Sequence, residues 1–368
     1  MAEMYKILVI NLGSTSSKIG YAENEKVIFE EEWDHVKEGV SIPRAYDEAV
    51  PFRMSYVDKF LEMHSLRMED MDAVGVRGMG NNGSYRHGAY LVTKEVADDV
   101  RSAKGGHPGL MAGTLIGEAI SLKYNIPAYL YDVVPTDEIE EIARITGIKG
   151  YRRLAHSHTL NGRATAKKAA EDLGLDFDHA TFLLSHIGGG TGSMLIKDGV
   201  IIDAYSAEEG GFSPIRAGRV PEQVLTKVLS SGDRAEADRV LKKEVGLNGH
   251  LGTGDCIEIE RRIEAGDKKA LLAYQAMAYQ LSKDIGALAT LVCGKVDAVL
   301  LTGGVANSKM FTGWMKDRLS FIAPVYVYPG TMELSALAGG VTRVLSGEEK
   351  VNDYSLTRVE HRLFEDLD

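Results

Sequence analysis

Residues 7–21 of the chain read ILVINLGSTSSKIGY, and residues 182–196 read FLLSHIGGGTGSMLI. In each stretch, an apolar run that is typical of a β-strand enters a turn of glycine, serine and threonine, and a second apolar run leaves it. Each turn therefore gathers backbone N–H groups and hydroxyls at the tip of a hairpin. This arrangement predicts two phosphate-binding loops.

The segments that follow the two stretches are also alike. A third strand is expected at 26–33 (KVIFEEEW) and at 199–205 (GVIIDAY), and DAVGVRG at 72–78 is echoed by DAVLLTGG at 297–304. We therefore expect an α/β fold in which one unit occurs twice. Each copy would offer a polar loop to a ligand that lies between them.

Length and composition narrow the functional classes. The 368 residues are enough for two domains with separate cores, and the net charge of -11 argues against binding to nucleic acid or an anionic membrane. Cys256 and Cys293 are too few for a disulfide framework or a cysteine-built metal site. The strand-like YKILVI at 5–10 has no basic and apolar leader before it, and glycines and hydroxyls interrupt the longest uncharged run, at 179–196. We expect a soluble cytoplasmic protein.

Hydrophobic periodicity predicts the other elements. Strands are expected at 5–11, 16–22, 26–33, 72–76, 127–134, 181–186, 193–197, 200–204, 298–302 and 322–328. Helices are expected at 45–65, 107–123, 137–147, 160–173, 221–230, 234–245, 257–265, 267–293, 307–320 and 333–346. Thr136 is a candidate N-cap, and Asp198-Gly199 predicts a type I′ turn. A buried stripe is predicted on one helix at Leu271, Tyr274, Ala278, Leu281, Ile285, Leu288 and Val292.

The first hairpin concentrates polar groups within eight residues. They are Asn11, Gly13, Ser14, Thr15, Ser16, Ser17 and Lys18. Gly13 is expected to permit a turn with positive φ, while the hydroxyls and Lys18 are suited to phosphate oxygens. The alternative is a plain polar hairpin.

The second hairpin is richer in glycine. Gly188, Gly189 and Gly190 leave a bare backbone, and the run ends neither as a Walker A loop nor as GxGxxG. At 302–308, TGGVANS leads a strand into Gly303-Gly304 and then a helix, whose N-terminus is suited to a nucleotide. A packing requirement for glycine is the alternative at this junction.

Charged residues follow several of these elements. Arg77 comes directly after a strand, and Arg216 follows the rigid turn GGFSP, so either guanidinium can neutralise a transferred phosphoryl group or form a surface ion pair. Asp132 ends an apolar strand and is a candidate to orient an arginine, to bind Mg²⁺ or to cap a turn. Glu333 starts a helix, where the dipole favours a carboxylate in any case.

Taken together, these segments resemble the acetate and butyrate kinase family, within the wider group that contains sugar kinases, heat-shock chaperones and actin. The likeness is greatest to butyrate kinases and runs in the family's order over nearly the whole chain. Further segments that carry it include HTLNGRATAKKAAEDLG, SHIGGG, GGFSPIRAG, GHLGTGD, LLTGGVANSKMF and FIAPVYVYPGTMELSALAGG.

The resemblance implies two actin-like ATPase domains, 1–154 with a returning C-terminal helix at 333–368, and a nucleotide-binding domain at 155–332. It implies reversible transfer of the γ-phosphoryl group of ATP, with Mg²⁺, to a short-chain carboxylate. A homodimer or larger homo-oligomer is expected from relatives. Butyrate is the expected acid, with acetate, propionate and isobutyrate as alternatives and a non-enzymatic ATP switch as a more distant one.

The resemblance also implies roles for individual residues. The catalytic set would be Arg77, Asp132, His158 and Arg216. Asn11, Ser14 and Lys18 would contact phosphate, and Asn11 and Glu333 would hold Mg²⁺. The nucleotide would be held by His186, Gly188, Gly189, Gly190, Asp255, Gly303, Gly304 and Asn307.

Some positions depart from the family's usual pattern. The loop after Arg77 reads GMGNNG rather than starting Gly-Gly, and Ser157 replaces the usual Phe before the aligned histidine. His107 is followed by an unusual Pro-Gly, and His156 competes with His158 for the histidine role. These changes leave the identity of the acid open.

Overall fold

The computed structural model describes residues 3–13, 16–35, 37–43, 45–78, 85–102, 108–154 and 157–357. The chain forms two compact units. Unit 1 comprises Met1–Glu138, Lys149–Arg152 and Met332–Asp368, and unit 2 comprises Ile139–Ile148 and Arg153–Thr331. The chain therefore leaves unit 1 to build unit 2 and returns to unit 1 near its C-terminal end.

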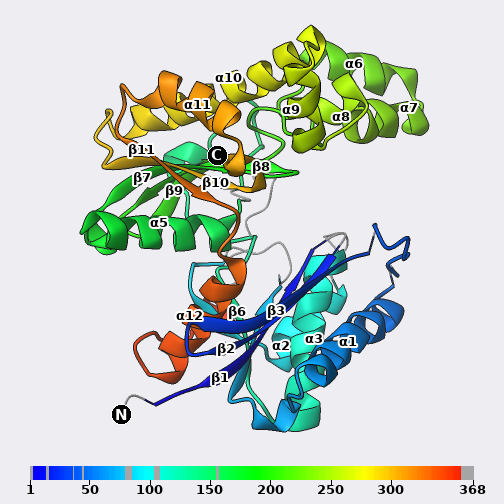
Figure 1. Ribbon diagram of the computed structural model, residues 1–368, viewed down its shortest axis with the longest axis vertical. Helices are drawn as coiled ribbons and strands as arrows, with labels where there is room; N and C mark the ends of the chain where they lie inside the picture. Colours follow the sequence, from blue (N-terminus) through cyan, green and yellow to red (C-terminus); the bar gives the residue numbers. More distant parts are fainter. Residues whose placement is uncertain are drawn as a thin grey trace. The chain divides into compact units, whose positions relative to one another are not determined.

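Unit 1 is built on a six-stranded sheet with the order β3-β2-β1-β4-β6-β5 (Figure 1). Its strands are β1 (Lys6–Leu12), β2 (Ser16–Glu23), β3 (Lys26–Asp34), β4 (Ala73–Arg77), β5 (Ala89–Leu91) and β6 (Ala128–Tyr131). The first three strands form an antiparallel meander, and β1, β4 and β6 run parallel to one another. The prediction of a buried parallel strand before Asp132 is confirmed, since all four residues of β6 are buried.

Helices cover both faces of this sheet. They are α1 (Tyr46–Met63), α2 (Lys94–Ser102), α3 (Pro108–Tyr124), α12 (Glu333–Leu345) and the short α13 (Tyr354–Thr357). On one face, Gly20 and Gly75 leave room for Leu334 and Val341 of α12. On the other, α3 packs on β1, β4 and β6. A 3₁₀ turn at Met68–Asp70 leads into β4.

Unit 2 repeats the plan with a five-stranded sheet of order β11-β10-β7-β8-β9. Its strands are β7 (Thr181–Ile187), β8 (Thr191–Lys197), β9 (Val200–Tyr205), β10 (Ala298–Gly303) and β11 (Val325–Pro329). The antiparallel meander β7-β8-β9 matches β1-β2-β3, and β10 runs parallel to β7 as β4 does to β1. The α/β fold with a repeated unit is therefore confirmed.

Unit 2 has a separate core on each face of its sheet. Its helices are α4 (Glu141–Arg144), α5 (Thr159–Leu173), α6 (Glu222–Ser231), α7 (Arg234–Asp238), α8 (Gly246–Leu251), α9 (Cys256–Glu264), α10 (Lys268–Leu291) and α11 (Lys309–Leu319). Helix α5 packs alanines against Phe182 and Leu184, and α10 packs against Leu183 and Leu195. Two 3₁₀ turns, Phe177–His179 and Gly304–Asn307, complete the unit.

The predicted stripe on α10 is confirmed in its central part. Its buried members are Tyr274, Ala278, Leu281, Ile285 and Leu288. Leu271 and Val292, at the two ends of the helix, are half-buried. The turn at Asp198-Gly199 is also confirmed, because φ is 51° and 75° at these residues, as a type I′ turn requires.

The helix prediction at 137–147 and the N-cap prediction at Thr136 are wrong, and the helix predicted at 234–245 changes its type along its length. Only Glu141–Arg144 is helical within 137–147, because the N–H of Glu140 donates to the carbonyl oxygen of Ile202 at 3.1 Å. Thr136 caps no helix, since its hydroxyl donates to the carbonyl oxygen of Val133 at 2.7 Å. The helix predicted at 234–245 gives way after Asp238 to a π-helical turn over Arg239–Lys243.

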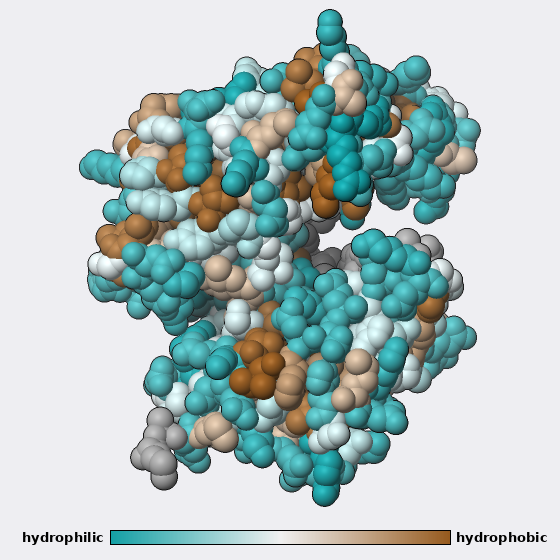
Figure 2. All heavy atoms as spheres, in the orientation of Figure 1, coloured by the Kyte–Doolittle hydropathy of each residue, from teal (hydrophilic) through white to brown (hydrophobic). Residues whose placement is uncertain are grey.

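The visible surface is mainly hydrophilic. On the face drawn in Figure 2, apolar residues form small groups among polar and charged ones. Within the described part of the chain, no helix is both long enough and apolar enough to cross a bilayer.

One glycine allows α3 to approach the end of β4. A Cβ at Gly113 would lie 2.2 Å from the carbonyl oxygen of Arg77, so only a glycine fits without a backbone shift. We expect Gly113→Ala to destabilise the protein by about 1–3 kcal/mol, the usual cost of overpacking. The free energy of unfolding from urea titrations tests this.

Gly286→Ala is the matched control, because a Cβ at Gly286 of α10 would meet nothing within 4 Å. This variant should be as stable as the wild type or more stable by up to about 1 kcal/mol, the gain from replacing a helical glycine. Equal stability of the Gly113→Ala variant and the wild type would contradict the close packing.

Candidate active site

The β1-β2 hairpin of unit 1 closes at Gly13, whose N–H donates to the carbonyl oxygen of Ser16 at 3.0 Å. The expectation of a positive φ at Gly13 is wrong, because its φ lies outside the left-handed region. A Cβ at Gly13 would instead lie 3.1 Å from the Ser16 hydroxyl, so the glycine supplies space. Ser14, a predicted phosphate ligand, lies outside the described residues.

Asn11, Arg77 and Glu333 come together at one end of the sheet of unit 1. Asn11 and Arg77 are register partners on the parallel strands β1 and β4, so their side chains project from the same face. Nη1 of Arg77 donates to Oδ1 of Asn11 at 3.3 Å and lies 3.4 Å from Oε1 of Glu333. Nδ2 of Asn11 donates to Oε2 of Glu333 at 2.7 Å. One guanidinium, one amide and one carboxylate are thus held together.

Glu333 is the first residue of α12, as predicted. The helix dipole favours its negative charge there, and the side chain bends back to β1 and β4. Both its side chain and that of Arg77 remain partly accessible, at 12% and 18% of their full exposure. A small anion or a cation can therefore reach this cluster.

Lys18 lies next to this cluster in the sheet. It is the register partner of Asn11 across the antiparallel pair β1-β2. Its Nζ lies 3.1 Å from Oε1 of Glu30 on β3, and both side chains are solvent-accessible. An exposed ion pair of this kind is weak, so it leaves Lys18 able to turn toward an anion.

Asp132 sits directly after β6 with a φ of 43°, in the left-handed region that non-glycine residues rarely adopt. Its side chain is buried. Oδ1 of Asp132 accepts from the N–H of Gly88 at 2.7 Å, and the N–H of Asp132 donates to the carbonyl oxygen of Gly88 at 3.1 Å. The carboxylate therefore fixes the backbone at the start of β5.

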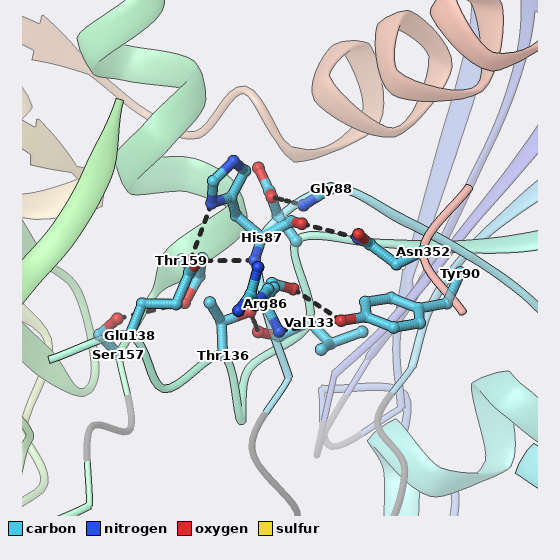
Figure 3. Close-up of polar contacts among 11 residues, drawn as sticks. Arg86, His87, Gly88, Tyr90, Val133, Thr136, Glu138, Ser157, Thr159 and Asn352 are labelled. Carbon is cyan, nitrogen blue, oxygen red and sulfur yellow. Dashed lines mark hydrogen bonds and ion pairs between the residues drawn. The ribbon is translucent and has the colours of Figure 1, made fainter. Parts of the chain in front are cut away.

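The segment before Gly88 is fixed by further polar contacts within unit 1. Glu138 accepts from the N–H of His87 at 3.0 Å, and the same carboxylate oxygen lies 2.8 Å from Nδ1 of His87 (Figure 3). Asn352 donates to the carbonyl oxygen of His87 at 2.9 Å. The backbone at His87, next to the Gly88 that Asp132 contacts, is thus held by both Glu138 and Asn352.

In unit 2, two of the predicted histidines stack on each other. The ring centroids of His158 and His186 are 3.9 Å apart with an interplanar angle of 17°. Nδ1 of His186 lies 2.9 Å from Nδ2 of the buried Asn161, which makes this amide the hydrogen-bond donor. His156, the rival histidine, lies outside the described residues.

The glycine turn of unit 2 is joined to the loop that carries Arg216. The N–H of Gly188 donates to the carbonyl oxygen of Gly190 at 3.0 Å. The carbonyl oxygen of Gly189 accepts from the Ser213 hydroxyl at 2.6 Å and from the N–H of Ile215 at 3.3 Å. The exposed Arg216 is therefore held at a fixed backbone position relative to this turn.

A buried carboxylate anchors the other end of the same loop. Asp284 of α10 accepts from the N–H of Gly211 at 2.6 Å and forms an ion pair with Arg219. Burial raises the pKa of Asp284, against the opposing effect of these two donors. No pattern in the sequence points to Asp284, because it lies in an ordinary amphipathic helix that is distant from the loop along the chain.

The strand-to-helix junction of unit 2 requires glycine at one position. Gly303 has a φ of 93°, and a Cβ there would lie 2.4 Å from the carbonyl oxygen of Ile187. No such contact limits Gly304. Nδ2 of Asn307 donates to the carbonyl oxygen of Gly304 at 3.0 Å, and Ser308 caps α11. This junction leaves the backbone around Gly304 open.

Asp255 has a structural role at the N-terminus of α9. It is the N-cap of α9 and accepts from the N–H groups of Ile257, at 2.9 Å, and Glu258, at 3.4 Å. Its nucleotide contact stays a prediction.

Sequence reasoning missed two residues behind the β1-β2 hairpin, Arg53 and His35. Arg53 of α1 is buried and donates to hairpin oxygens, including that of Ser17 at 2.7 Å. The Ser17 hydroxyl also lies 2.9 Å from Nε2 of the buried His35. A charged residue within a predicted amphipathic helix gives no sign that it points inward, so this contact was invisible in the sequence.

Comparisons with known proteins now identify the family. Residues 125–322 match the acetokinase family. The chain is 38% identical over 356 residues to a protein named probable butyrate kinase 2 from Caldanaerobacter subterraneus subsp. tengcongensis, with 95% of this chain and 100% of that protein covered. The chain belongs to the acetokinase family.

Solved structures share the fold of this acetokinase family member. The acetate kinase of Porphyromonas gingivalis matches with a TM-score of 0.76 and 22% identity, over 92% of this chain and 99% of that one. A propionate kinase from Francisella tularensis subsp. tularensis SCHU S4 matches with a TM-score of 0.73 and 17% identity, over 92% and 99% of the two chains. The predicted fold class, that of the actin-like ATPases, is thereby confirmed.

The buried His35 gives the stability a pH dependence. Burial, and then the charge of Arg53, lower the pKa of His35 below its usual value. The unfolded chain therefore binds the proton first as the pH falls below about 6.5, and stability is lost from there down to the folded-state pKa. Above about 6.5 the contribution is complete.

When the pH falls from 7.5 to 5.5, we expect the His35→Gln variant to lose less stability than the wild type. The difference is at most about 1.4 kcal/mol per pH unit, the limit for one proton. Urea midpoints across this range provide the measurement. His179→Gln is the control, because contact with Asp176 raises the pKa of this exposed histidine. Its removal should therefore make the variant lose more stability than the wild type as the pH falls. Parallel curves for His35→Gln and the wild type would contradict the assignment.

Proposed function

We propose that this protein is a butyrate kinase-type phosphotransferase. It would transfer the γ-phosphoryl group of ATP reversibly to a short-chain carboxylate, giving an acyl phosphate and ADP. The observation that carries the proposal is the match, over 95% of this chain, to the whole length of a protein named as a probable butyrate kinase. Structures of acetate and propionate kinases share the fold, which is consistent with this reaction class.

The reaction needs little covalent help from the protein. A carboxylate oxygen forms the new bond to the γ-phosphorus as the bond from that phosphorus to the bridging oxygen breaks, and ADP leaves with the electron pair. No proton has to be removed from the nucleophile. The main obstacle is to bring one anion up to another, so positive charge and alignment supply most of the catalysis.

Arg77 is suited to this task. The contacts with Asn11 and Glu333 hold its guanidinium at the end of β4 while leaving it partly accessible. A charge that is already oriented stabilises the transition state without reorganisation. We assign Arg77 to the carboxylate and to the phosphoryl group in transfer.

The residues of unit 1 also fit a magnesium ion. Asn11 and Glu333 offer an amide oxygen and a carboxylate, which are the hard donors that Mg²⁺ prefers. Among the described residues, no three His, Cys, Asp or Glu side chains form a cluster that could hold a metal. Mg²⁺ would therefore be shared with substrate phosphates, where it neutralises charge on the transferring group.

We assign the remaining predicted residues to supporting tasks. Asp132 would keep the backbone at Gly88 in place beside the acid, and Lys18 would turn to a phosphate oxygen. In unit 2, the glycine turn and the Gly303-Gly304 junction would approach the nucleotide, with Asn307 and Asp255 nearby. His186 and Asn161 would orient His158 for the phosphoryl group, to which Arg216 would add positive charge. A cytoplasmic homo-oligomer stays a prediction.

The activity is tested by trapping the acyl phosphate with hydroxylamine in the presence of Mg-ATP, with straight and branched acids of two to five carbons. We expect the highest kcat/KM with butyrate. A maximum at acetate, propionate or isobutyrate would reassign the acid within the same reaction. Binding of ATP without hydroxamate from any of these acids would contradict the kinase and favour an ATP-dependent switch.

The two arginines are tested by substitution. Arg77→Ala and Arg216→Ala should each lower kcat by about 10²-fold or more, the usual loss on removing a preorganised charge contact. Arg67→Ala is the control, because Arg67 is exposed and, among the residues that the structure describes, forms an ion pair only with Glu69, at 3.8 Å. Steady-state kinetics with near-normal turnover in either active-site variant would remove that arginine from the site.

A further inference from the structure

A buried cation lies behind the β1-β2 hairpin. Arg53, in the middle of α1, is 1% exposed. Its Nη1 donates to the carbonyl oxygen of Ser16 at 2.6 Å and to the Ser17 hydroxyl at 2.7 Å, and its Nη2 donates to the carbonyl oxygen of Gly13 at 2.9 Å. Gly13 follows the end of β1, and Ser16 and Ser17 begin β2, so one guanidinium holds the two sides of the turn together.

The three acceptors of Arg53 are all uncharged. No carboxylate of the described residues forms an ion pair with it, although 53 aspartates and glutamates give the chain a net negative charge. His35, which shares Ser17 with Arg53, supplies no negative charge either. A buried charge without a counter-ion is unfavourable, and burial lowers the pKa of Arg53 to about 10. Arg53 nevertheless stays protonated at neutral pH.

The equivalent hairpin of unit 2 is held in a different way. There, the carbonyl oxygen of Gly189 accepts from the Ser213 hydroxyl and the Ile215 N–H, both neutral donors. A fixed positive charge behind a turn is thus a property of the β1-β2 hairpin. Neutral donors would have held that turn as well, so the cation calls for a further explanation.

We propose that Arg53 positions the β1-β2 hairpin for the terminal phosphoryl group of ATP, and that this anion supplies the negative charge that Arg53 lacks within the protein. The inference rests on the proposed function, because it takes this hairpin as the γ-phosphate loop. Arg53 acts through the backbone of Gly13 and Ser16 and through Ser17, and its charge acts across a buried region where screening is weak. It is therefore a positioning residue.

Three variants separate charge from packing. Arg53→Met removes the charge and the three hydrogen bonds, while Arg53→Lys keeps the charge but cannot span all three acceptors. Val57→Ala is the matched control, because Val57 is buried one turn later on α1 and carries no charge. For each variant, the affinities for Mg-ATP and Mg-ADP are measured by calorimetry. The kcat and both KM values are measured by the hydroxamate assay.

We expect Arg53→Met to bind ATP about tenfold more weakly and ADP within about twofold of the wild type, because only ATP carries the γ-phosphoryl charge. Its kcat should fall by about tenfold or more, with the KM for the acid nearly unchanged. Val57→Ala should lose stability but keep the preference for ATP over ADP.

Arg53→Lys should lower kcat and keep most of that preference, which makes it decisive if Arg53→Met does not fold. The inference is overturned if Arg53→Met prefers ATP over ADP as strongly as Val57→Ala does. It is also overturned if the preference in Arg53→Lys is as low as in Arg53→Met. Failure of the proposed function is recognised separately, since the wild type itself would then form no hydroxamate.

Discussion

The carboxylate of Glu333 joins three parts of unit 1 that are far apart in the chain. It accepts from Asn11 at the end of β1 and pairs with Arg77 at the end of β4. The parallel register of the two strands places Asn11 and Arg77 side by side, and the return of the chain as α12 brings Glu333 to them. The cluster therefore forms only when the C-terminal segment has docked. That docking requires a glycine at position 340 of α12, because the ring of Tyr131 leaves no room there for a side chain.

The two hairpins share a topology and differ in chemistry. Both are tips of an antiparallel pair whose first strand lies in the middle of its sheet. Behind the first, Arg53 provides a buried positive charge, and beside it stand Lys18 and Arg77. Behind the second, neutral donors hold bare glycine backbone, and the stacked rings of His158 and His186 lie at the same sheet edge. A duplicated frame thus carries one hairpin backed by a buried charge and one held by neutral donors.

An acidic chain can still bind anions, because its positive charges are placed by the fold. The net charge is -11, yet three cations lie around the first hairpin: Lys18 on β2, Arg77 at the end of β4 and Arg53 behind the turn. Ion pairs and hydrogen bonds tether each of them to a nearby element. Composition therefore argues against extended anionic partners such as nucleic acid and says little about a small anion.

The sequence by itself determined the repeat, the family and the strands other than β5. Apolar runs bounded by glycine-rich turns identify the strands because a strand needs only local alternation and a turn, and the repeat of these runs reveals the duplicated unit. The long periodic stripe of α10 was equally readable, whereas the segment at 137–147 was not, because a distant carbonyl oxygen, that of Ile202, takes the hydrogen bond of Glu140. Polar residues at the ends of strands, such as Arg77 and Asp132, could be predicted because each follows an apolar run that is typical of a strand. Only the tertiary structure could reveal Arg53, Asp284 and Asn161. Their roles depend on which way a helix faces and on partners tens of residues away, and no local pattern encodes either.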